Sequence, residues 1–381
     1  MVLPKSGAHV HLLGICGTAM ASLAGLLKAK GYHVTGSDQN PYPPMSTQLA
    51  NLGISIMKGY SAENLAKKPD FVIVGNVISK GNPEAQALLA SDIPYTSLPK
   101  ALGEWVIENR TSLVVAGTHG KTTITSLLSW VRDQCGKKPG FMIGGIPKNF
   151  SLSFRNPEGD FFVIEGDEYD TAFFDKVPKF VHYRPSHVIL SSVEFDHADI
   201  YRDLNHVKEA FSMLMKRLPA HGVLMFWGED ENVRQMAQLA TTDNKFSYGI
   251  MGSSGDGQCD YQCDYQGEVI SQSEFRVTFR GSKKLGVFQT NLTGQYNLLN
   301  ALGVIGLAHQ LGWNLQDVAK GISTFLGVKR RQEILGEPGG VLVIEDFAHH
   351  PTAVKNTVEA IQNKYSGRRV ISVFEPRSAT S

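Results

Sequence analysis

A glycine-rich turn followed by one lysine and two threonines is the strongest chemical signal in this 381-residue chain. It follows an apolar run at residues 114–116 and opens a helical pattern. In such a turn the backbone N–H groups face phosphates, the lysine neutralises the β and γ oxygens, and the next hydroxyl binds Mg²⁺. The first glycine of the full pattern is Val115 here, but the strand before and the helix after still favour a nucleoside triphosphate site. Its predicted residues are Gly117, Thr118, His119, Gly120, Lys121, Thr122 and Thr123.

Acidic residues follow the next candidate strand, residues 161–164. Glu165 stands nearest the strand end, where a carboxylate that comes after a phosphate loop can reach the metal on a triphosphate. We therefore predict Thr122 and Glu165 as metal ligands. Asp167, Glu168 and Asp170 are either further ligands or solvated loop charges, which is the usual fate of an acidic run.

A histidine with acidic neighbours, His197, follows the strand at residues 188–190. It could bind a second Mg²⁺ or take part in proton transfer, whereas a lone histidine is more often a packed structural residue. Because it follows a strand of the same sheet and has acids on both sides, we favour the functional interpretation.

Polar residues later in the chain offer partners for the rest of a nucleotide. Asn297 and Asn300 are three apart on one helix face and could bind the edge of an adenine, although Asn297 could also be a simple helix cap. Arg330 belongs to a basic cluster that is either a solvated run or a phosphate clamp. Asp346 and His350 follow a strand, at the functional edge of a parallel sheet.

A second glycine turn lies near the N-terminus, between a strand at residues 9–13 and a helix at residues 20–29. Asp38 follows about twenty residues later, where dinucleotide-binding folds carry a ribose-binding acid. The glycines are spaced too widely for that fingerprint, so we expect the turn to approach another diphosphate, with a purely structural turn as the alternative. Its residues are Gly14, Ile15, Cys16, Gly17 and Thr18.

The elements that must position these residues alternate between strand and helix. Strands at residues 9–13, 32–36 and 70–75 predict a parallel sheet with ligands at its carboxyl edge. A strand at 341–344, a helix at 354–361 and a strand at 370–374 are too little for a domain of their own. We expect α/β units at residues 1–107, 108–332 and 333–381, the last of them truncated.

Composition excludes several classes of protein. The formal net charge of +1 gives no broad basic surface for nucleic acid. The chain has no run of about eighteen apolar residues, so no membrane span is predicted. The first residues lack the apolar core of a signal peptide, which predicts a cytoplasmic protein.

Together these motifs resemble those of the Mur ligase family, the ATP-dependent amide ligases of peptidoglycan synthesis. The matching motifs occur in order at residues 14–17, 117–123, 165–168, 196–199, 294–297, 330–331 and 349–352. The resemblance implies an α/β protein of three domains: a Rossmann-like UDP-binding domain, a central P-loop ATPase domain and the start of a C-terminal Rossmann-like domain.

The resemblance also implies roles for the candidate residues. ATP would convert a muramoyl carboxylate into an acyl phosphate, which an amine then displaces. Lys121, Glu165 and His197 would be catalytic, and two Mg²⁺ ions would be held by Thr122, Glu165 and His197. Asn297 and Asn300 would hold adenine, Arg330 the phosphates and Asp346 the ribose. Residues 14–18 and Asp38 would hold the UDP-sugar.

The finer pattern resembles the recycling branch of the family. That branch implies joining L-alanyl-γ-D-glutamyl-meso-diaminopimelate to UDP-N-acetylmuramate, with His350 and Arg377 near the peptide. The alternatives are the L-alanine-adding branch and, more remotely, a P-loop nucleotide sensor without catalysis. Several family members carry a carbamylated lysine after the motif histidine, but residues 210–213 contain none. The oligomeric state stays open.

Overall fold

The computed structural model describes residues 4–198, 200–251 and 262–375. The first unit is a parallel sheet of five strands in the order β3-β2-β1-β4-β5. The strand order reverses at β1, so the loop after β1 opens at the point where parallel sheets bind ligands. The elements are β1 (His9–Leu13), α1 (Thr18–Ala29), β2 (His33–Asp38), α2 (Met45–Asn51), β3 (Ser55–Lys58), the 3₁₀-helix η1 (Ala62–Leu65), β4 (Phe71–Val74), α3 (Pro83–Leu89) and β5 (Tyr95–Ser97).

A larger sheet of ten strands follows, in the order β17-β16-β15-β14-β13-β12-β6-β9-β7-β8. The connection from the first unit runs through α4 (Leu98–Ala101) and the π-helix η2 (Leu102–Ile107). The first half of the unit contains β6 (Thr111–Ala116), α5 (Lys121–Gln134), β7 (Gly140–Met142), β8 (Phe154–Arg155), β9 (Phe161–Gly166), β10 (Asp170–Ala172), β11 (Asp175–Pro178), the 3₁₀-helix η3 (Lys179–His182) and β12 (Pro185–Leu190). The second half contains α6 (Leu204–Met215), β13 (Leu224–Trp227), α7 (Glu231–Gln238), β14 (Lys245–Ile250), β15 (Tyr265–Val269), β16 (Glu274–Phe279), β17 (Lys283–Gln289), α8 (Gln295–Gln310) and α9 (Leu315–Ser323).

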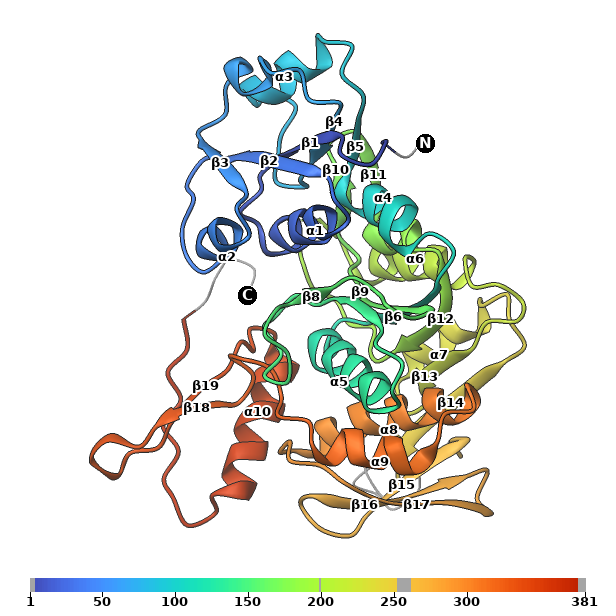
Figure 1. Ribbon diagram of the computed structural model, residues 1–381. Helices are drawn as coiled ribbons and strands as arrows, with labels where there is room; N and C mark the ends of the chain where they lie inside the picture. Colours follow the sequence, from blue (N-terminus) through green and yellow to red (C-terminus); the bar gives the residue numbers. More distant parts are fainter. Residues whose placement is uncertain (1–3, 199, 252–261, 376–381) are drawn as a thin grey trace.

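The centre of this sheet is buried on both faces. In β6, Leu113 and Val115 pack with α5, α8 and α9, which Figure 1 shows on one side of the sheet. Val114 and Ala116 face the opposite core, which is shared with α1, α6 and the first unit. This explains the continuous apolar run, because strands covered by helices on both faces do not alternate with polar residues.

Parallel pairing brings three strand ends to one edge. β6 lies between β12 and β9, with Ala116 in register with Leu190 and with Gly166. The loops after β6, β9 and β12 therefore begin side by side. These loops carry residues 117–120, 167–169 and 191–197, the segments in which we predicted the chemistry.

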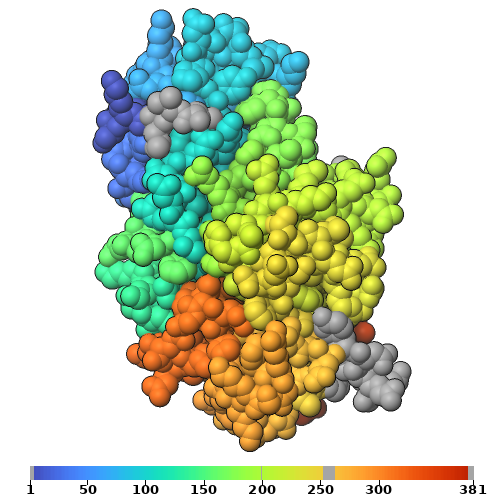
Figure 2. Space-filling view, turned by 90° about the vertical axis from the view of Figure 1, so that its right-hand side faces the viewer, coloured from blue at the N-terminus to red at the C-terminus, as the bar shows by residue number. Residues whose placement is uncertain are grey.

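The two large units are packed against each other. Figure 2 shows the N-terminal unit above the central one, in contact over a broad front. Gly25 of α1 meets the ring of Phe154 so closely that an added Cβ would lie 2.1 Å from the Cζ atom. A side chain at this position of α1 would require the Phe154 ring, or the packing between the two units, to shift.

The C-terminal segment is small and differs from the prediction in one element. It contains β18 (Glu333–Gly336), the 3₁₀-helix η4 (Pro338–Gly340), β19 (Val343–Glu345) and α10 (Pro351–Lys364). The predicted strand at residues 370–374 is wrong, because the structure has no strand there and Val373 is 94% exposed. β19 pairs with β18 in an antiparallel hairpin. Apolar residues become a strand only where a neighbour offers backbone partners, and no described segment does so here.

None of the described helices has both the length and the apolar character needed to cross a membrane. The α/β fold class and the parallel sheets expected from the sequence are confirmed.

Candidate functional site

The phosphate loop is fixed to the segment that follows β12. The backbone N–H of Thr118 donates to the carbonyl of Ser192, and that of His119 donates to the Ser192 hydroxyl at 2.8 Å. Gly117 has a φ of +135°, and a Cβ there would lie 2.2 Å from Ser191 Oγ. Gly120 is the N-cap of α5 at a φ of +81°. Both positions require glycine, since side chains are strained at these angles.

Lys121 points back into its own loop. Its ammonium group donates to the carbonyl of Gly117 at 2.7 Å and to the Glu168 carboxylate at 3.0 Å. Burial alone would lower the pKa of Lys121, but Glu168 and the neighbouring carboxylates outweigh it and raise the pKa. Glu168 is 2% exposed, so its interpretation as a solvated loop charge is wrong. It is the buried counter-ion of the lysine.

Glu165 and Thr122 lie together at the base of the loop. The Thr122 hydroxyl donates to Glu165 Oε2 at 3.0 Å, and the backbone N–H of Gly144 donates to Oε1 at 2.6 Å. Burial, followed by repulsion from Asp167, raises the pKa of Glu165 to about 7. Negative charge is therefore concentrated beside the phosphate loop.

His197 faces the same carboxylates from the loop after β12. Its Nε2 lies 2.8 Å from the Tyr169 hydroxyl and 3.7 Å from Glu168 Oε1. Its backbone has a φ of +58°, unusual for a residue with a side chain, and its N–H donates to the Asp196 carboxylate. Strained backbone of this kind is concentrated at functional sites.

Asn297 and Asn300 lie on the opposite side of the loop, at the start of α8. Both are buried, and the Asn300 amide donates to the Asn297 carbonyl oxygen at 3.3 Å. The Asn297 amide donates to the Thr293 carbonyl. A Cβ on Gly120 would come within 2.9 Å of Asn300 Oδ1, so the pair lies directly against the loop.

Two neighbouring arginines of the C-terminal segment differ in their surroundings. The predicted residue Arg330 is half exposed and pairs with Glu345 at 2.7 Å. Its neighbour Arg331 lines the cavity beside the loop. Asp346 lines the same cavity and accepts hydrogen bonds from the backbone N–H groups of Gln332 and Ala348.

These groups surround a cavity of about 500 Å³. Its wall is formed by the phosphate loop, the acidic residues of the β9 and β12 loops, the start of α8 and the start of α10. Of the predicted residues, it is lined by Thr118, His119, Gly120, Lys121, Thr122, Thr123, Glu165, His197, Asn297, Asn300, Asp346 and His350. Its size suits a nucleotide, because ligand pockets commonly span about 300–1,000 Å³.

A second cavity, of about 150 Å³, opens at the start of α1. Gly14, Gly17 and Thr18 line it, as the sequence predicted. The first turn of α1 carries no acidic residue, so its N–H groups favour an anion. The two cavities share Glu165 and Asp167 in their walls.

Other residues of the first turn have supporting positions. Ile15 is fully buried in the core. The N–H of Cys16 donates to the Asp38 carboxylate at 2.9 Å, so Asp38 braces the turn and lies outside the lining of the cavity. Burial and then the Asp38 charge raise the pKa of the Cys16 thiol to about 11. Arg377, predicted near the peptide, and Asp199, beside the motif histidine, lie outside the described residues.

Family comparisons agree with this geometry along the whole chain. Residues 9–110 match the Mur ligase family catalytic domain, residues 115–308 the Mur ligase middle domain, and residues 330–381 the Mur ligase glutamate ligase domain. The chain belongs to the Mur ligase family. It is therefore an ATP-dependent ligase, and the resemblance inferred from its motifs is confirmed.

Individual relatives cover nearly all of this Mur ligase. It is 44% identical over 373 residues to the UDP-N-acetylmuramate–L-alanyl-γ-D-glutamyl-meso-2,6-diaminoheptandioate ligase of Escherichia coli, covering 98% of this chain and 79% of the relative. It is 32% identical to the UDP-N-acetylmuramate–L-alanine ligase of Syntrophomonas wolfei, covering 97% and 77%. The crystal structure of a murein peptide ligase from Psychrobacter arcticus superposes with a TM-score of 0.82 at 37% identity, covering 98% and 80%.

The donor set of this Mur ligase fits ATP with Mg²⁺. A threonine hydroxyl, two carboxylates and a histidine surround the point where the phosphate loop ends, and oxygen donors of this kind suit a hard cation. Glu165 is the clearest case, because burial and then repulsion from Asp167 raise its pKa, and a bound divalent cation would offset both.

Sequence reasoning missed part of the second cavity. Lys179 lines it and lies 3.4 Å from the Asp167 carboxylate, and Tyr183 and residues 142–144 are also part of its wall. Lys179 begins η3, after the β10–β11 hairpin, and no motif spacing connects it to the turn at residues 14–18. The one signal in the sequence that could have identified Lys179 was its position shortly after the predicted acidic loop.

Proposed function

We propose that this Mur ligase joins the tripeptide L-alanyl-γ-D-glutamyl-meso-diaminopimelate to UDP-N-acetylmuramate, with ATP converted into ADP and phosphate. The observation that carries the proposal is the shared wall of the two cavities at Glu165 and Asp167. A nucleotide in the larger cavity and a UDP-sugar at the start of α1 would bring their reactive ends together there. The tripeptide as amine substrate is supported by the names of the relatives that are 37–44% identical.

The first step would join the two bound anions. An oxygen of the muramoyl carboxylate attacks the γ-phosphorus, the bond from that phosphorus to the β-phosphate oxygen breaks, and ADP leaves. Lys121 would leave its present partners, Glu168 and the Gly117 carbonyl, and bind phosphate oxygens instead. Its positive charge would then lie where the triphosphate and the muramoyl carboxylate repel each other. The N–H groups of residues 117–120 would orient the phosphates.

The second step would form the amide. The peptide amine attacks the acyl carbon, the carbon–oxygen bond to phosphate breaks, and the amine loses a proton as inorganic phosphate leaves. Lys179, 3.4 Å from Asp167 in the second cavity, is a candidate to hold the sugar carboxylate in line during both steps.

We propose two Mg²⁺ sites, one at Thr122 and Glu165 and the other at His197. The ions would neutralise charge between phosphate and carboxylate. Asn297 and Asn300 would contact the adenine and Asp346 the ribose. Arg331, which lines the cavity, is a better candidate than Arg330 for the phosphate contact. His350 and Arg377 would lie near the peptide.

The test is amine-dependent release of ADP with UDP-N-acetylmuramate and Mg²⁺ present. The tripeptide should support turnover, and free L-alanine should support little. The reverse result would assign the protein to the alanine-adding branch, and ATP hydrolysis without any amine dependence would contradict ligation. A Lys121→Met variant, which should lose turnover with either amine, controls for contaminating ATPases.

A further inference from the structure

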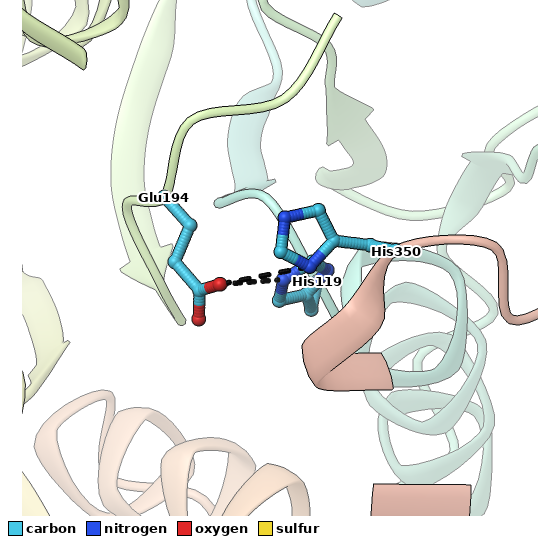
Figure 3. A group of neighbouring side chains, drawn as sticks. All are labelled: His119, Glu194 and His350. Atoms are coloured by element: carbon cyan, nitrogen blue, oxygen red, sulfur yellow. Dashed lines mark ion pairs between the residues drawn. The ribbon is translucent and has the colours of Figure 1, made fainter. Parts of the chain in front are cut away.

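Two histidines and a glutamate from three distant parts of the chain meet at the rim of the larger cavity. His119 comes from the phosphate loop, Glu194 from the loop after β12, and His350 from the residue before α10 (Figure 3). Glu194 Oε2 lies 3.4 Å from His119 Nε2 and 3.6 Å from His350 Nδ1. All the candidate ligand atoms lie within 4.8 Å of one another.

The two separations that involve Glu194 are close to the edge of a metal tetrahedron. Zinc binds histidine nitrogen and carboxylate oxygen at about 2.0–2.2 Å, which puts neighbouring ligand atoms of a tetrahedral site about 3.3 Å apart. Two histidines with one carboxylate, leaving an open fourth position, is the donor set of many zinc sites. The side chains are 15–27% exposed, so an ion could reach them through the cavity.

The surrounding hydrogen bonds orient two of the three side chains as ligands. His350 Nε2 faces the Phe195 carbonyl at 3.2 Å, which favours a proton on Nε2, and Nδ1 accepts a long 3.3 Å hydrogen bond from the Thr352 N–H that a metal ion on Nδ1 would replace. The Thr352 hydroxyl donates to Glu194 Oε2 at 2.7 Å. Metal-binding histidines and carboxylates are usually held by such outer partners.

The third ligand atom, His119 Nε2, is buried and pairs with Glu194 Oε2 at 3.4 Å. Its ring packs against that of His350 at a centroid distance of 4.5 Å. A contact of 3.4 Å is too long for a good hydrogen bond, so a metal ion between the two atoms would satisfy the buried nitrogen better than the carboxylate alone does.

We propose that His119, Glu194 and His350 form a binding site for a divalent transition metal, with Zn²⁺ as the best match. The site is separate from the Mg²⁺ positions at Thr122, Glu165 and His197. An ion there would tie the phosphate loop directly to the start of α10. Imidazole nitrogen favours Zn²⁺ over Mg²⁺, so millimolar Mg²⁺ should not displace it.

The test is Zn²⁺ binding by the chelator-treated protein, measured by competition with a chromogenic chelator in excess Mg²⁺. We expect one tight equivalent, and Co²⁺ in its place should give the intense visible absorption of a four-coordinate site. Two variants should each weaken Zn²⁺ binding about 100-fold or more. Loss of a residue that only hydrogen bonds to a metal ligand costs about 10–100-fold, so a larger loss indicates that a ligand itself was removed. Glu194→Gln removes the charge, and His350→Asn removes the imidazole while keeping a good helix N-cap.

A His197→Asn variant is the matched control, because it removes a histidine from the proposed Mg²⁺ site and should leave the tight Zn²⁺ equivalent unchanged. Zn²⁺ binding that survives Glu194→Gln and His350→Asn, or that is lost in His197→Asn, would overturn the proposal. So would displacement of Zn²⁺ by Mg²⁺. Circular dichroism of each variant separates loss of a ligand from loss of the fold.

Discussion

At the scale of single residues, the site is organised around buried charge. Lys121 and Glu168 are 12% and 3% exposed and satisfy each other, while Glu165 carries a carboxyl group whose pKa is raised to about 7. The lysine must leave its carboxylate when phosphate arrives. Phosphate binding is therefore coupled to breaking the ion pair between Lys121 and Glu168.

Glu168→Gln should destabilise the empty protein by about 3–5 kcal/mol, because it leaves Lys121 buried without its counter-ion. ATP supplies new partners for the lysine, so the rise in Tm on adding nucleotide should be larger in the variant than in the parent. Thermal unfolding with and without ATP measures both effects. The control is Glu158→Gln, which breaks the exposed pair with Lys138 and should change neither value. An equal rise in Tm on adding ATP in the variant and the parent would contradict the change of partner by Lys121.

Glu165 should make the stability of the metal-free protein depend on pH. Its pKa in the folded state, about 7, lies above its ordinary value of 4.5, so folding favours the protonated form. The stabilisation is complete below pH 4.5 and is lost as the pH rises through about 7. Urea unfolding in a chelating buffer across this range should show a fall in the free energy of unfolding that Glu165→Gln reduces. An identical slope in that variant would assign the pH dependence to other groups.

At the scale of elements, the loop after β6 owes its shape to the loop that follows the neighbouring strand β12. Gly117 combines a φ of +135° with a Ser191 hydroxyl that occupies the space of a side chain. The neighbouring residues Thr118 and His119 are hydrogen bonded to Ser192. The loop conformation is therefore imposed by residues 191–192, directly after β12, as well as by its own glycines.

Gly117→Ala should destabilise the protein by about 1–3 kcal/mol and abolish measurable ATP binding. The backbone φ angle is strained for alanine, and the Ser191 hydroxyl occupies the space that the new methyl group needs. Gly136→Ala is the matched control. Gly136 also has a positive φ, of +71°, but nothing lies within 4 Å of its Cβ position, so that variant carries backbone strain alone. Chemical unfolding and equilibrium binding of an ATP analogue distinguish the two. Normal ATP binding in Gly117→Ala would show that the loop adapts.

At the scale of the whole molecule, the proposed reaction requires that the two units hold their ligands end to end. The N-terminal and central units share one hydrophobic core, and their cavities meet at Glu165 and Asp167. The alignment of the two cavities therefore depends on the packing of α1 against residues of the central unit.

Gly25→Leu should disturb that alignment, because even a Cβ at this position would overlap the ring of Phe154. Overpacking of this kind costs about 1–3 kcal/mol. We expect weaker binding of UDP-N-acetylmuramate and slower ligation, with ATP affinity changed much less. Ala29→Leu adds comparable bulk at an exposed position of the same helix and should be neutral. Calorimetric titration with each ligand checks this, and an equal loss of both affinities would indicate general unfolding.

The sequence alone determined the features that depend on neighbours along the chain. The glycine turns, the helices that follow them and the acids at strand ends are local patterns, so the phosphate loop, Glu165, His197 and the turn at residues 14–18 could be predicted. Prediction was weaker where an element needed a distant partner. The short edge strands β3 and β5 were missed, and residues 370–374 were predicted as a strand although no described neighbour pairs with them.

The tertiary structure alone decided which of those residues meet. Glu168 became the partner of Lys121, Lys179 reached the second cavity, and His119, Glu194 and His350 converged on one point. The order of strands β12, β6 and β9 brings Glu168 to Lys121 and Glu194 to His119, because parallel strands that are far apart in sequence bring their carboxyl ends to one edge. Spacing in a single sequence does not encode that order, which is decided by how sheet and helices bury their apolar faces together.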